Sequence, residues 1–285
     1  MPLRVTLARK KKVPLNISKV CIITKLNNQD ATEAARKIAD FFRARHVEVF
    51  SINNIDHPEA ITISPEKIRN MNLDLVFSVG GDGTTLRTFR MLPNSTPVFS
   101  VNIGGTRGIL AEIAGDFDIN EKLQNIVRGD CFLDARIRIT AQVGDKILGP
   151  ALNDIVITRS GLTRTPSFKI CLLDQCFSVR MDGIIAATPT GSTGHSLSLG
   201  GPIVHEQVDC LMILPVAPVK RMPCFIVSPQ VISITSTHDS KLVIDGQDVY
   251  EIKAEASILI SRYRFDATFV RLRKRGITQI AKLGF

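Results

Sequence analysis

Short apolar runs and one amphipathic stretch alternate along the first fifty residues. The β-branched run 20–24 and the run 47–52 predict strands. Between them, small and apolar side chains recur three and four positions apart over 30–46. This spacing predicts a helix with one buried face, and Asp30 and Glu33 are suited to begin it. Strand, helix and strand in this order are typical of the start of an open parallel sheet.

The next apolar run, 73–79, ends abruptly in a glycine-rich sequence formed by Gly80, Gly81, Asp82 and Gly83. This pattern predicts a buried parallel strand that leads into a tight turn and then into a helix over 84–91. Three glycines around one carboxylate allow backbone N–H groups to approach a phosphate, and the helix N-terminus favours the same anion. The carboxylate itself is better suited to a hydroxyl or a metal. An ordinary strand-to-helix turn with a surface Asp is the alternative.

A second glycine-rich loop follows the predicted strand 97–101. It contains Asn102 and the glycines of 104–105 and 108. Ligands of open parallel sheets bind outside the carboxyl ends of the strands, so two such loops predict one crevice. The alternative is an ordinary connection. The segment 53–71 is predicted to be a linker with a short helix.

From about residue 131 the pattern changes to short alternating segments, after a connecting helix over 116–128. The predicted strands are 133–142, 151–159, 167–173, 176–181, 210–215, 231–236, 241–245 and 256–263. Strands at this density predict an antiparallel β-rich domain, with one helical interruption after 190–194. We therefore expect an α/β domain with an open parallel sheet over 1–115, to which 268–285 returns, and a β-rich domain over 116–267. The basic segment 1–17 predicts a loose arm or a short edge strand at 3–8.

Length and composition agree with two domains. The chain has 285 residues, of which 44% are hydrophobic, and no apolar run approaches the roughly 20 residues of a membrane span. No apolar segment suited to a signal peptide follows the basic N-terminus. The six cysteines form no CxxC pair, so reduced, buried thiols in a cytoplasmic protein are expected.

The net charge of +9 permits an anionic partner such as a nucleotide or polyphosphate. Nucleic acid is disfavoured because the chain has no Trp and only two Tyr with which to stack bases. The basic clusters 9–12 and 271–275 are expected to form solvated faces or to contact donor phosphates.

Two further groups of polar residues lie in the β-rich half. Asn153 and Asp154 form an amide–carboxylate pair that can bind a ribose, although a pair of polar residues at a strand start is as good an interpretation. The segment 181–204 combines Asp182, the sequence TPTGST and a later GGP, and offers amides and hydroxyls to a phosphate or a sugar. The chain has no Gly-Lys pair for a Walker A loop, no HExxH and no GxSxG, which argues against P-loop, zincin and serine-hydrolase chemistry.

GGDGT at 80–84, the Asn-Asp pair, DG at 182–183 with TPTGST at 188–193, and GGP at 200–202 together resemble the NAD kinase family. GGDGT alone is shared with diacylglycerol and sphingosine kinases, and in variant form with 6-phosphofructokinases, whereas TPTGST followed by GGP is much more specific. The similarity spans roughly 73–250. It implies an N-terminal α/β domain, a C-terminal β-rich domain with the site between them, and phosphorylation of the adenosine-ribose 2′-hydroxyl of NAD to give NADP.

The resemblance also implies roles for individual residues. Asp82 corresponds to the proton acceptor for the 2′-hydroxyl. Residues that correspond to substrate contacts are Gly80, Gly81, Gly83, Thr84, Arg87, Asn153, Asp154, Arg164, Arg180, Asp182, Thr190, Thr193, Gly194, His195, Ser196, Leu197, Ser198, Ala217 and Gln247. Three positions depart from the family pattern. Asp154 replaces a frequent Glu, His195 replaces a frequent Tyr, and Val219 to Arg221 follow the Ala-Pro pair where relatives often carry a His.

The implied partners are NAD and a phosphoryl donor, ATP or inorganic polyphosphate. A divalent metal, expected to be Mg²⁺, would come bound to the donor phosphates, so no metal-ligating residue is predicted in the chain. A homodimer or homotetramer is expected, and neither nucleic acid nor membrane is expected as a partner. The alternatives are a lipid kinase of the diacylglycerol or sphingosine type, and a non-catalytic nucleotide-binding protein.

Overall fold

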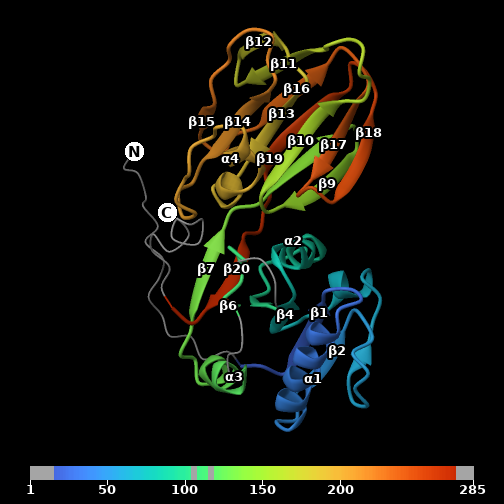
Figure 1. The fold of residues 1–285 in the computed structure, drawn as a ribbon, viewed down its shortest axis with the longest axis vertical. Helices are drawn as coiled ribbons and strands as arrows, with labels where there is room; N and C mark the ends of the chain where they lie inside the picture. The colour runs from blue at the N-terminus through green and yellow to red at the C-terminus, as the bar shows by residue number, and fades with distance from the viewer. Residues whose placement is uncertain (1–15, 104–107, 115–118, 274–285) are drawn as a thin grey trace. The chain divides into compact units, whose positions relative to one another are not determined.

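The computed structural model describes residues 16–103, 108–114 and 119–273, and the chain forms two compact units (Figure 1). The first unit is formed by residues up to Ala135 together with the segment that begins at Ala267, and the second unit is Arg136–Asp266. The first unit therefore extends past residue 115, the boundary expected from the sequence, because the strand that begins at Phe132 joins the first sheet. The predicted edge strand at 3–8 lies outside the described residues.

Within the described residues, the first unit contains an eight-stranded sheet in the order β3-β2-β1-β4-β5-β20-β7, with β6 paired to β5. Its strands are β1 (Lys19–Thr24), β2 (Glu48–Ser51), β3 (Ile61–Thr62), β4 (Leu75–Val79), β5 (Val98–Asn102), β6 (Ile113–Ala114), β7 (Phe132–Arg136) and β20 (Ala267–Arg271). Neighbouring strands from β3 to β5, and the pairs of β5 with β6 and β20, are parallel. β1, β4 and β5 are almost entirely buried, which explains why they have the continuous apolar runs of parallel strands.

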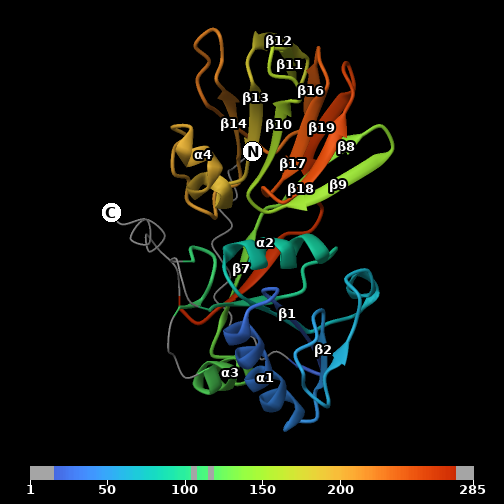
Figure 2. The same ribbon diagram turned by 45° about the vertical axis from the view of Figure 1, so that its right-hand side comes forward.

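The helices of the first unit are α1 (Gln29–Arg43), the short η1 (Lys67–Asn70), α2 (Asp82–Met91) and α3 (Ile119–Val127). The side chain of Asn28 begins α1 by accepting a hydrogen bond from the N–H of Ala31 at 2.8 Å, so the cap lies two residues before the predicted Asp30. α1 and α3 lie next to each other in both ribbon views and bury Phe42 and Leu123 in one core (Figure 2). Phe89 of α2 packs instead on Phe269 of β20, with ring centroids 4.5 Å apart.

The second unit contains two six-stranded sheets, in the orders β15-β14-β13-β10-β17-β18 and β12-β11-β16-β19-β8-β9, and its strand pairs are antiparallel. The strands are β8 (Ile139–Val143), β9 (Lys146–Ala151), β10 (Asp154–Arg159), β11 (Ser167–Leu172), β12 (Gln175–Arg180), β13 (Gly183–Ala187), β14 (Leu211–Val216), β15 (Phe225–Val227), β16 (Ile232–Ser236), β17 (Ser240–Ile244), β18 (Asp248–Ile252) and β19 (Ser257–Arg262). Inward residues of both sheets, such as Ile157 and Ile234, form one shared core. The predicted fold class is confirmed.

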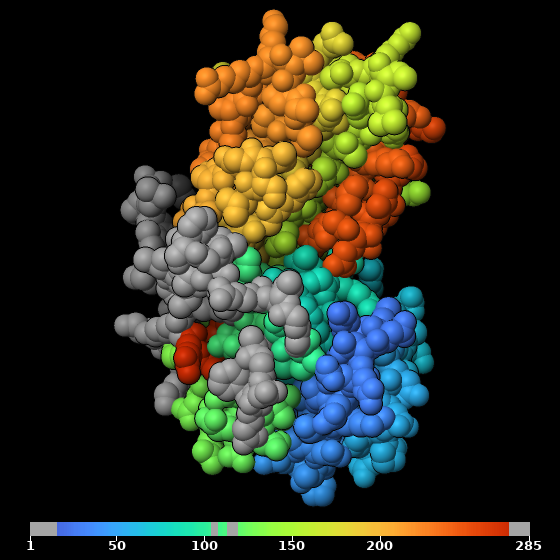
Figure 3. Space-filling model, in the orientation of Figure 1, coloured from blue at the N-terminus to red at the C-terminus, as the bar shows by residue number. Residues whose placement is uncertain are grey.

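Several details of the second unit differ from the sequence prediction. The segment predicted as one strand, 133–142, forms β7 and β8, and β9, β13, β15 and β18 were not predicted. The expected helical interruption is present as η2 (Thr190–Thr193), whose first three residues are buried, and α4 (His195–Ser198), which reaches the surface in the amber region of the space-filling view (Figure 3).

The expectation that all cysteines are reduced and buried is wrong for one pair. Cys171 and Cys176 form a disulfide, because the tight turn between β11 and β12 places them directly opposite each other in the hairpin. Cys176 is exposed. Among the residues that the structure describes, no helix is long and apolar enough to cross a membrane.

Candidate active site

The carboxylate of Asp82 stands at the start of α2, directly after the glycine turn that ends β4. Its Oδ2 accepts the N–H of Ile109 at 2.8 Å, and its Oδ1 accepts the N–H of Leu110 at 3.0 Å. Each oxygen therefore receives one backbone hydrogen bond from the loop after β5, and retains lone-pair capacity for a further donor. The turn and the second glycine-rich loop lie together, as the sequence indicated, although residues 104–107 of that loop lie outside the described residues.

The glycines around Asp82 differ in what an added side chain would contact. A Cβ on Gly80 would lie 2.9 Å from the Cβ of Thr84, and one on Gly108 would lie 3.0 Å from Oδ1 of Asp82. A Cβ on Gly81 would meet nothing within 4 Å. Gly80 and Gly108 are thus required by the packing of the turn itself, whereas Gly81 keeps space open in front of the helix N-terminus, where an anion is favoured.

The other predicted residues of this turn divide by exposure. Gly83 is exposed, Arg87 is half-buried and Thr84 is buried. The hydroxyl-bearing Thr84 therefore faces the interior of the turn, and its backbone N–H bonds to the carbonyl of Gly81 at 3.0 Å.

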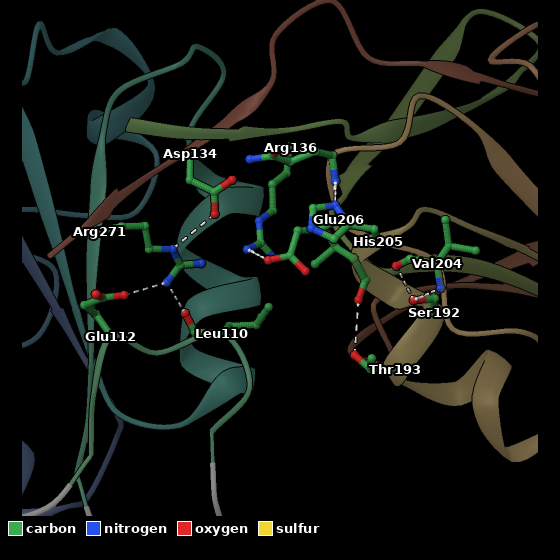
Figure 4. A network of polar contacts seen from close by, with 12 residues as sticks. Leu110, Glu112, Asp134, Arg136, Ser192, Thr193, Val204, His205, Glu206 and Arg271 are labelled. Carbon is green, nitrogen blue, oxygen red and sulfur yellow. Dashed lines mark hydrogen bonds and ion pairs between the residues drawn. The ribbon is translucent and has the colours of Figure 1, made fainter. Parts of the chain in front are cut away.

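A buried arginine, whose burial the sequence analysis did not predict, holds the loop next to Asp82. Arg271, at the end of β20, is 2% exposed and donates from Nη1 to the carbonyl of Leu110 at 2.7 Å (Figure 4). Its Nε lies 3.2 Å from Oδ2 of Asp134, and its Nη1 lies 3.4 Å from Oε2 of Glu112. The expectation that 271–275 forms a solvated face or contacts phosphate is wrong for Arg271. The apolar pattern ATFV that precedes it, a buried strand, is the signal that could have indicated its burial.

In the second unit, the carboxylate of Asp245 organises the start of β10. It accepts backbone N–H groups of Leu152 at 3.1 Å, Asn153 at 2.8 Å and Asp154 at 3.3 Å. Asp154 is 5% exposed, and burial, together with the charge of Asp245, raises the pKa of its carboxyl to about 7. Near neutral pH, Asp154 is therefore present in good part as a carboxylic acid that can donate a hydrogen bond.

The TPTGST loop packs directly on the Asn-Asp pair. The N–H of Thr188 donates to the carbonyl of Asn153 at 2.8 Å, and a Cβ on Gly191 would lie 2.7 Å from the carbonyl carbon of Asn153. Only glycine allows this approach. In the part of the chain that the structure describes, Oδ1 of Asn153 and Oγ1 of Thr190 are buried and have no hydrogen-bond partner. Buried polar atoms of this kind are normally satisfied, so both atoms have capacity for a further hydrogen bond.

The same loop is fastened to the segment that follows α4. The hydroxyl of Ser192 bonds to both the N–H and the carbonyl of Val204, each at 3.1 Å (Figure 4). Two residues later, the buried Glu206 accepts from Nη2 of the buried Arg136 at 2.6 Å. The hydroxyl of Ser196 donates back to the carbonyl of Gly191 at 2.9 Å. The loop is thus held in one shape by side chains that point away from solvent.

The remaining predicted residues are placed as follows. Asp182 forms a two-pronged ion pair with Arg159, with Nε–Oδ1 at 3.1 Å and Nη2–Oδ2 at 3.2 Å. The exposed side chains are Arg164, Arg180, His195, Ser198, Ala217 and Gln247, and the half-buried residues are Thr193, Gly194 and Leu197. Asp182 therefore already has a strong partner within the protein, and the others are accessible to a ligand.

Two sequence models of domain families match the chain over most of its length. The ATP-NAD kinase N-terminal domain matches residues 20–131, and the ATP-NAD kinase C-terminal domain matches 152–272. The chain belongs to the NAD kinase family. Curated relatives agree: the NAD kinase of Methanosarcina barkeri is 32% identical over 266 residues, with 90% of this chain and 94% of the relative covered. The NAD kinase of Methanocorpusculum labreanum is 32% identical, with 88% and 93% covered.

Solved structures show the same fold. An NAD kinase from Archaeoglobus fulgidus in complex with ATP superposes with a TM-score of 0.76 at 25% identity, covering 93% of this chain and 98% of that one. Yeast NADH kinase complexed with NADH gives a TM-score of 0.81 at 24% identity, covering 94% and 88%. The predicted family and the predicted NAD kinase phosphotransferase function are confirmed, and the lipid-kinase and non-catalytic alternatives are not supported.

Proposed function

We propose that this NAD kinase transfers a phosphoryl group to the 2′-hydroxyl of the adenosine ribose of NAD and that Asp82 accepts the hydroxyl proton. The supporting observation is the Asp82 carboxylate, which is fixed by two backbone N–H groups and free to accept a third hydrogen bond. The 2′-oxygen forms a bond to the phosphorus as the bond between phosphorus and the donor's bridging oxygen breaks. The proton moves from the hydroxyl to the carboxylate. Phosphoryl transfer depends mainly on positioning, which these fixed contacts supply.

The phosphoryl donor in this proposal is ATP or inorganic polyphosphate. Its phosphates would bind near the N-terminal end of α2, a ten-residue helix whose first turn carries partial positive charge. The open space at Gly81 allows them to approach the backbone closely. Mg²⁺ would enter as part of the donor substrate and neutralise developing charge. Among the described residues no group of three or more His, Cys, Asp or Glu side chains is arranged to bind a metal ion.

In the second unit, we assign NAD recognition to the Asn-Asp pair and the TPTGST loop. The partnerless Oδ1 of Asn153 and Oγ1 of Thr190 would bond to ribose hydroxyls or to the amide of NAD. Asp154, in its neutral form, would donate a hydrogen bond. The exposed His195 offers an imidazole where many relatives offer a phenol ring, so we expect it to stack less strongly on the ligand.

We further propose that the protein is cytoplasmic and assembles as a homodimer or homotetramer. Analytical ultracentrifugation of the purified chain tests the second statement, because a sedimentation coefficient of a single 31.3 kDa chain at micromolar concentration would contradict it.

The decisive experiment is a coupled assay for NADP formation from NAD and Mg²⁺ with either ATP or polyphosphate as donor. We expect product with at least one donor. Asp82→Asn should lower turnover by about 100-fold or more, because the amide cannot accept the proton. Binding of NAD, measured by calorimetry, should remain close to that of the unaltered protein. Turnover near the unaltered level in this variant would refute the role of Asp82. Binding of NAD without any product would instead indicate a nucleotide sensor.

A further inference from the structure

The carbonyl and the amide of one loop residue connect Asp82 to a buried arginine. Leu110 donates its N–H to Oδ1 of Asp82 at 3.0 Å and accepts a hydrogen bond on its carbonyl from Nη1 of Arg271 at 2.7 Å. The N–H and the carbonyl of Leu110 therefore each form a hydrogen bond to a charged side chain. Such charge-assisted hydrogen bonds are stronger than those between neutral groups. Arg271 lies 161 positions from Leu110 along the chain and comes from a different strand.

Arg271 is itself held by two acidic side chains in a nearly dry environment. Its guanidinium is paired with Asp134 and Glu112, and the side chains of Arg271 and Glu112 are 2% and 6% exposed. The carboxylate of Glu112 also accepts the backbone N–H of Leu272 at 2.8 Å. The loop at 110–112 is thus clamped to the end of β20 by two opposite contacts, Arg271 on Leu110 and Glu112 on Leu272. The ring of Phe269, 4.1 Å from the guanidinium carbon, supports it from one side.

We propose that Arg271 is a positioning residue for catalysis: it fixes the backbone of Ile109 and Leu110 and through them the orientation of the Asp82 carboxylate. The inference rests on the proposed role of Asp82 as proton acceptor. A displacement of about 1 Å at a reacting group costs on the order of 100-fold in rate, so a loop released from Arg271 should lower turnover. The ground-state affinity for NAD should change little, because the effect of Arg271 runs through the Asp82 carboxylate, whose loss in Asp82→Asn is itself expected to leave NAD binding nearly unaltered.

Arginine, and not lysine, fits this position. The planar guanidinium presents several N–H donors in a fixed geometry, and three acceptors use it: Leu110, Asp134 and Glu112. A lysine ammonium keeps the positive charge that the two buried carboxylates need. It is a compact point charge, however, and cannot reproduce the planar arrangement of N–H donors. Arg271→Lys should therefore fold yet hold Leu110 poorly.

Steady-state kinetics of Arg271→Lys and Arg271→Gln test the proposal. We expect kcat to fall about 10- to 100-fold while KM for NAD changes by less than about two-fold. The same changes are then made in the Asp82→Asn background. If Arg271 acts through Asp82, they should lower the residual kcat by less than about two-fold, because residues that act as a unit are not additive. Equal losses in both backgrounds would overturn the proposal.

Arg138 provides a matched control. It is also fully buried, donates from Nε to the carbonyl of Phe265 at 2.9 Å, and belongs to the second unit. Arg138→Lys should lower thermal stability without the selective loss of kcat. If it lowers kcat as much as Arg271→Lys, the effect of Arg271 is merely structural. The two proposals fail on different results. If the unaltered protein forms no NADP, the proposed function is wrong. The inference about Arg271 is judged only on variants of an enzyme that does form NADP.

Discussion

The buried carboxyl of Asp154 makes the stability of the second unit depend on pH, and Asp154→Asn should remove that dependence. The carboxyl has a pKa of about 7 in the folded protein, raised by burial and by the neighbouring charge of Asp245 from its ordinary value of 3.8. Between these two values the folded state binds one proton more than the unfolded state. The contribution of Asp154 to the free energy of unfolding therefore falls as pH rises through this window and is constant outside it.

The magnitude follows from linkage. Each pH unit inside the window costs 2.303RT, or roughly 1.4 kcal/mol, so a rise from pH 5 to pH 7 should cost the unaltered protein about 3 kcal/mol relative to Asp154→Asn. Below pH 4 the carboxyl contributes no further change. Above pH 7 the full penalty of the buried charge is present, so the variant should be the more stable protein at pH 8.

The assay can be confined to the unit that contains Asp154. The chain has no Trp, and its two tyrosines, Tyr250 and Tyr263, both lie in the second unit. Tyrosine fluorescence during urea unfolding at pH 5, 6, 7 and 8 therefore reports the free energy of unfolding of this unit. Other titrating groups cancel in the difference between variant and unaltered protein.

An exposed aspartate of the same unit serves as a control. The N–H of Ala254 and the ammonium of Lys253 lower the pKa of Asp239, so its contribution has the opposite sign and is lost as pH falls. Asp239→Asn should therefore lower stability by an amount that stays constant from pH 5 to pH 8, because the pKa of Asp239 lies below this range. A difference between Asp154→Asn and the unaltered protein that does not vary with pH from 5 to 8 would refute the assignment of a neutral Asp154.

Two glycine substitutions test the packing around the site. Gly108→Ala places a Cβ 3.0 Å from the proposed catalytic carboxylate and should lower kcat by about 10-fold. Gly81→Ala should leave thermal stability unchanged but weaken binding of the phosphoryl donor, which would be seen as a higher KM for the donor. Equal effects of the two changes on kcat and on KM for the donor would contradict this distinction. Gly191→Ala forces a Cβ against the backbone of Asn153 and should cost about 1–3 kcal/mol of unfolding free energy together with NAD affinity. Gly161→Ala, whose Cβ meets nothing within 4 Å, is the control in tyrosine fluorescence and calorimetry, and an equal loss there would count against the packing argument.

The features that the sequence predicted well depend on neighbours along the chain. The strand 73–79, the turn at Gly80 and the helix after Asp82 follow from a buried apolar run and from turn chemistry, both of which are local. The motif TPTGST was identified for the same reason. Errors arose where two local signals competed. The glycines and hydroxyls of 181–204 suggested a loop and obscured β13, whose residues Gly183–Ala187 are all buried.

By itself, then, the sequence determined the family, the two classes of sheet and the identity of the proposed proton acceptor. Only the tertiary structure decided what holds that acceptor in place. Asp82 receives its hydrogen bonds from residues 27 and 28 positions away, and Leu110 receives its own from Arg271. Asp245, more than ninety positions from the Asn-Asp pair, binds its backbone and shifts the pKa of Asp154. Such contacts depend on the order of strands in a sheet, and burial of a charge becomes favourable only once that order brings its partners within hydrogen-bond distance.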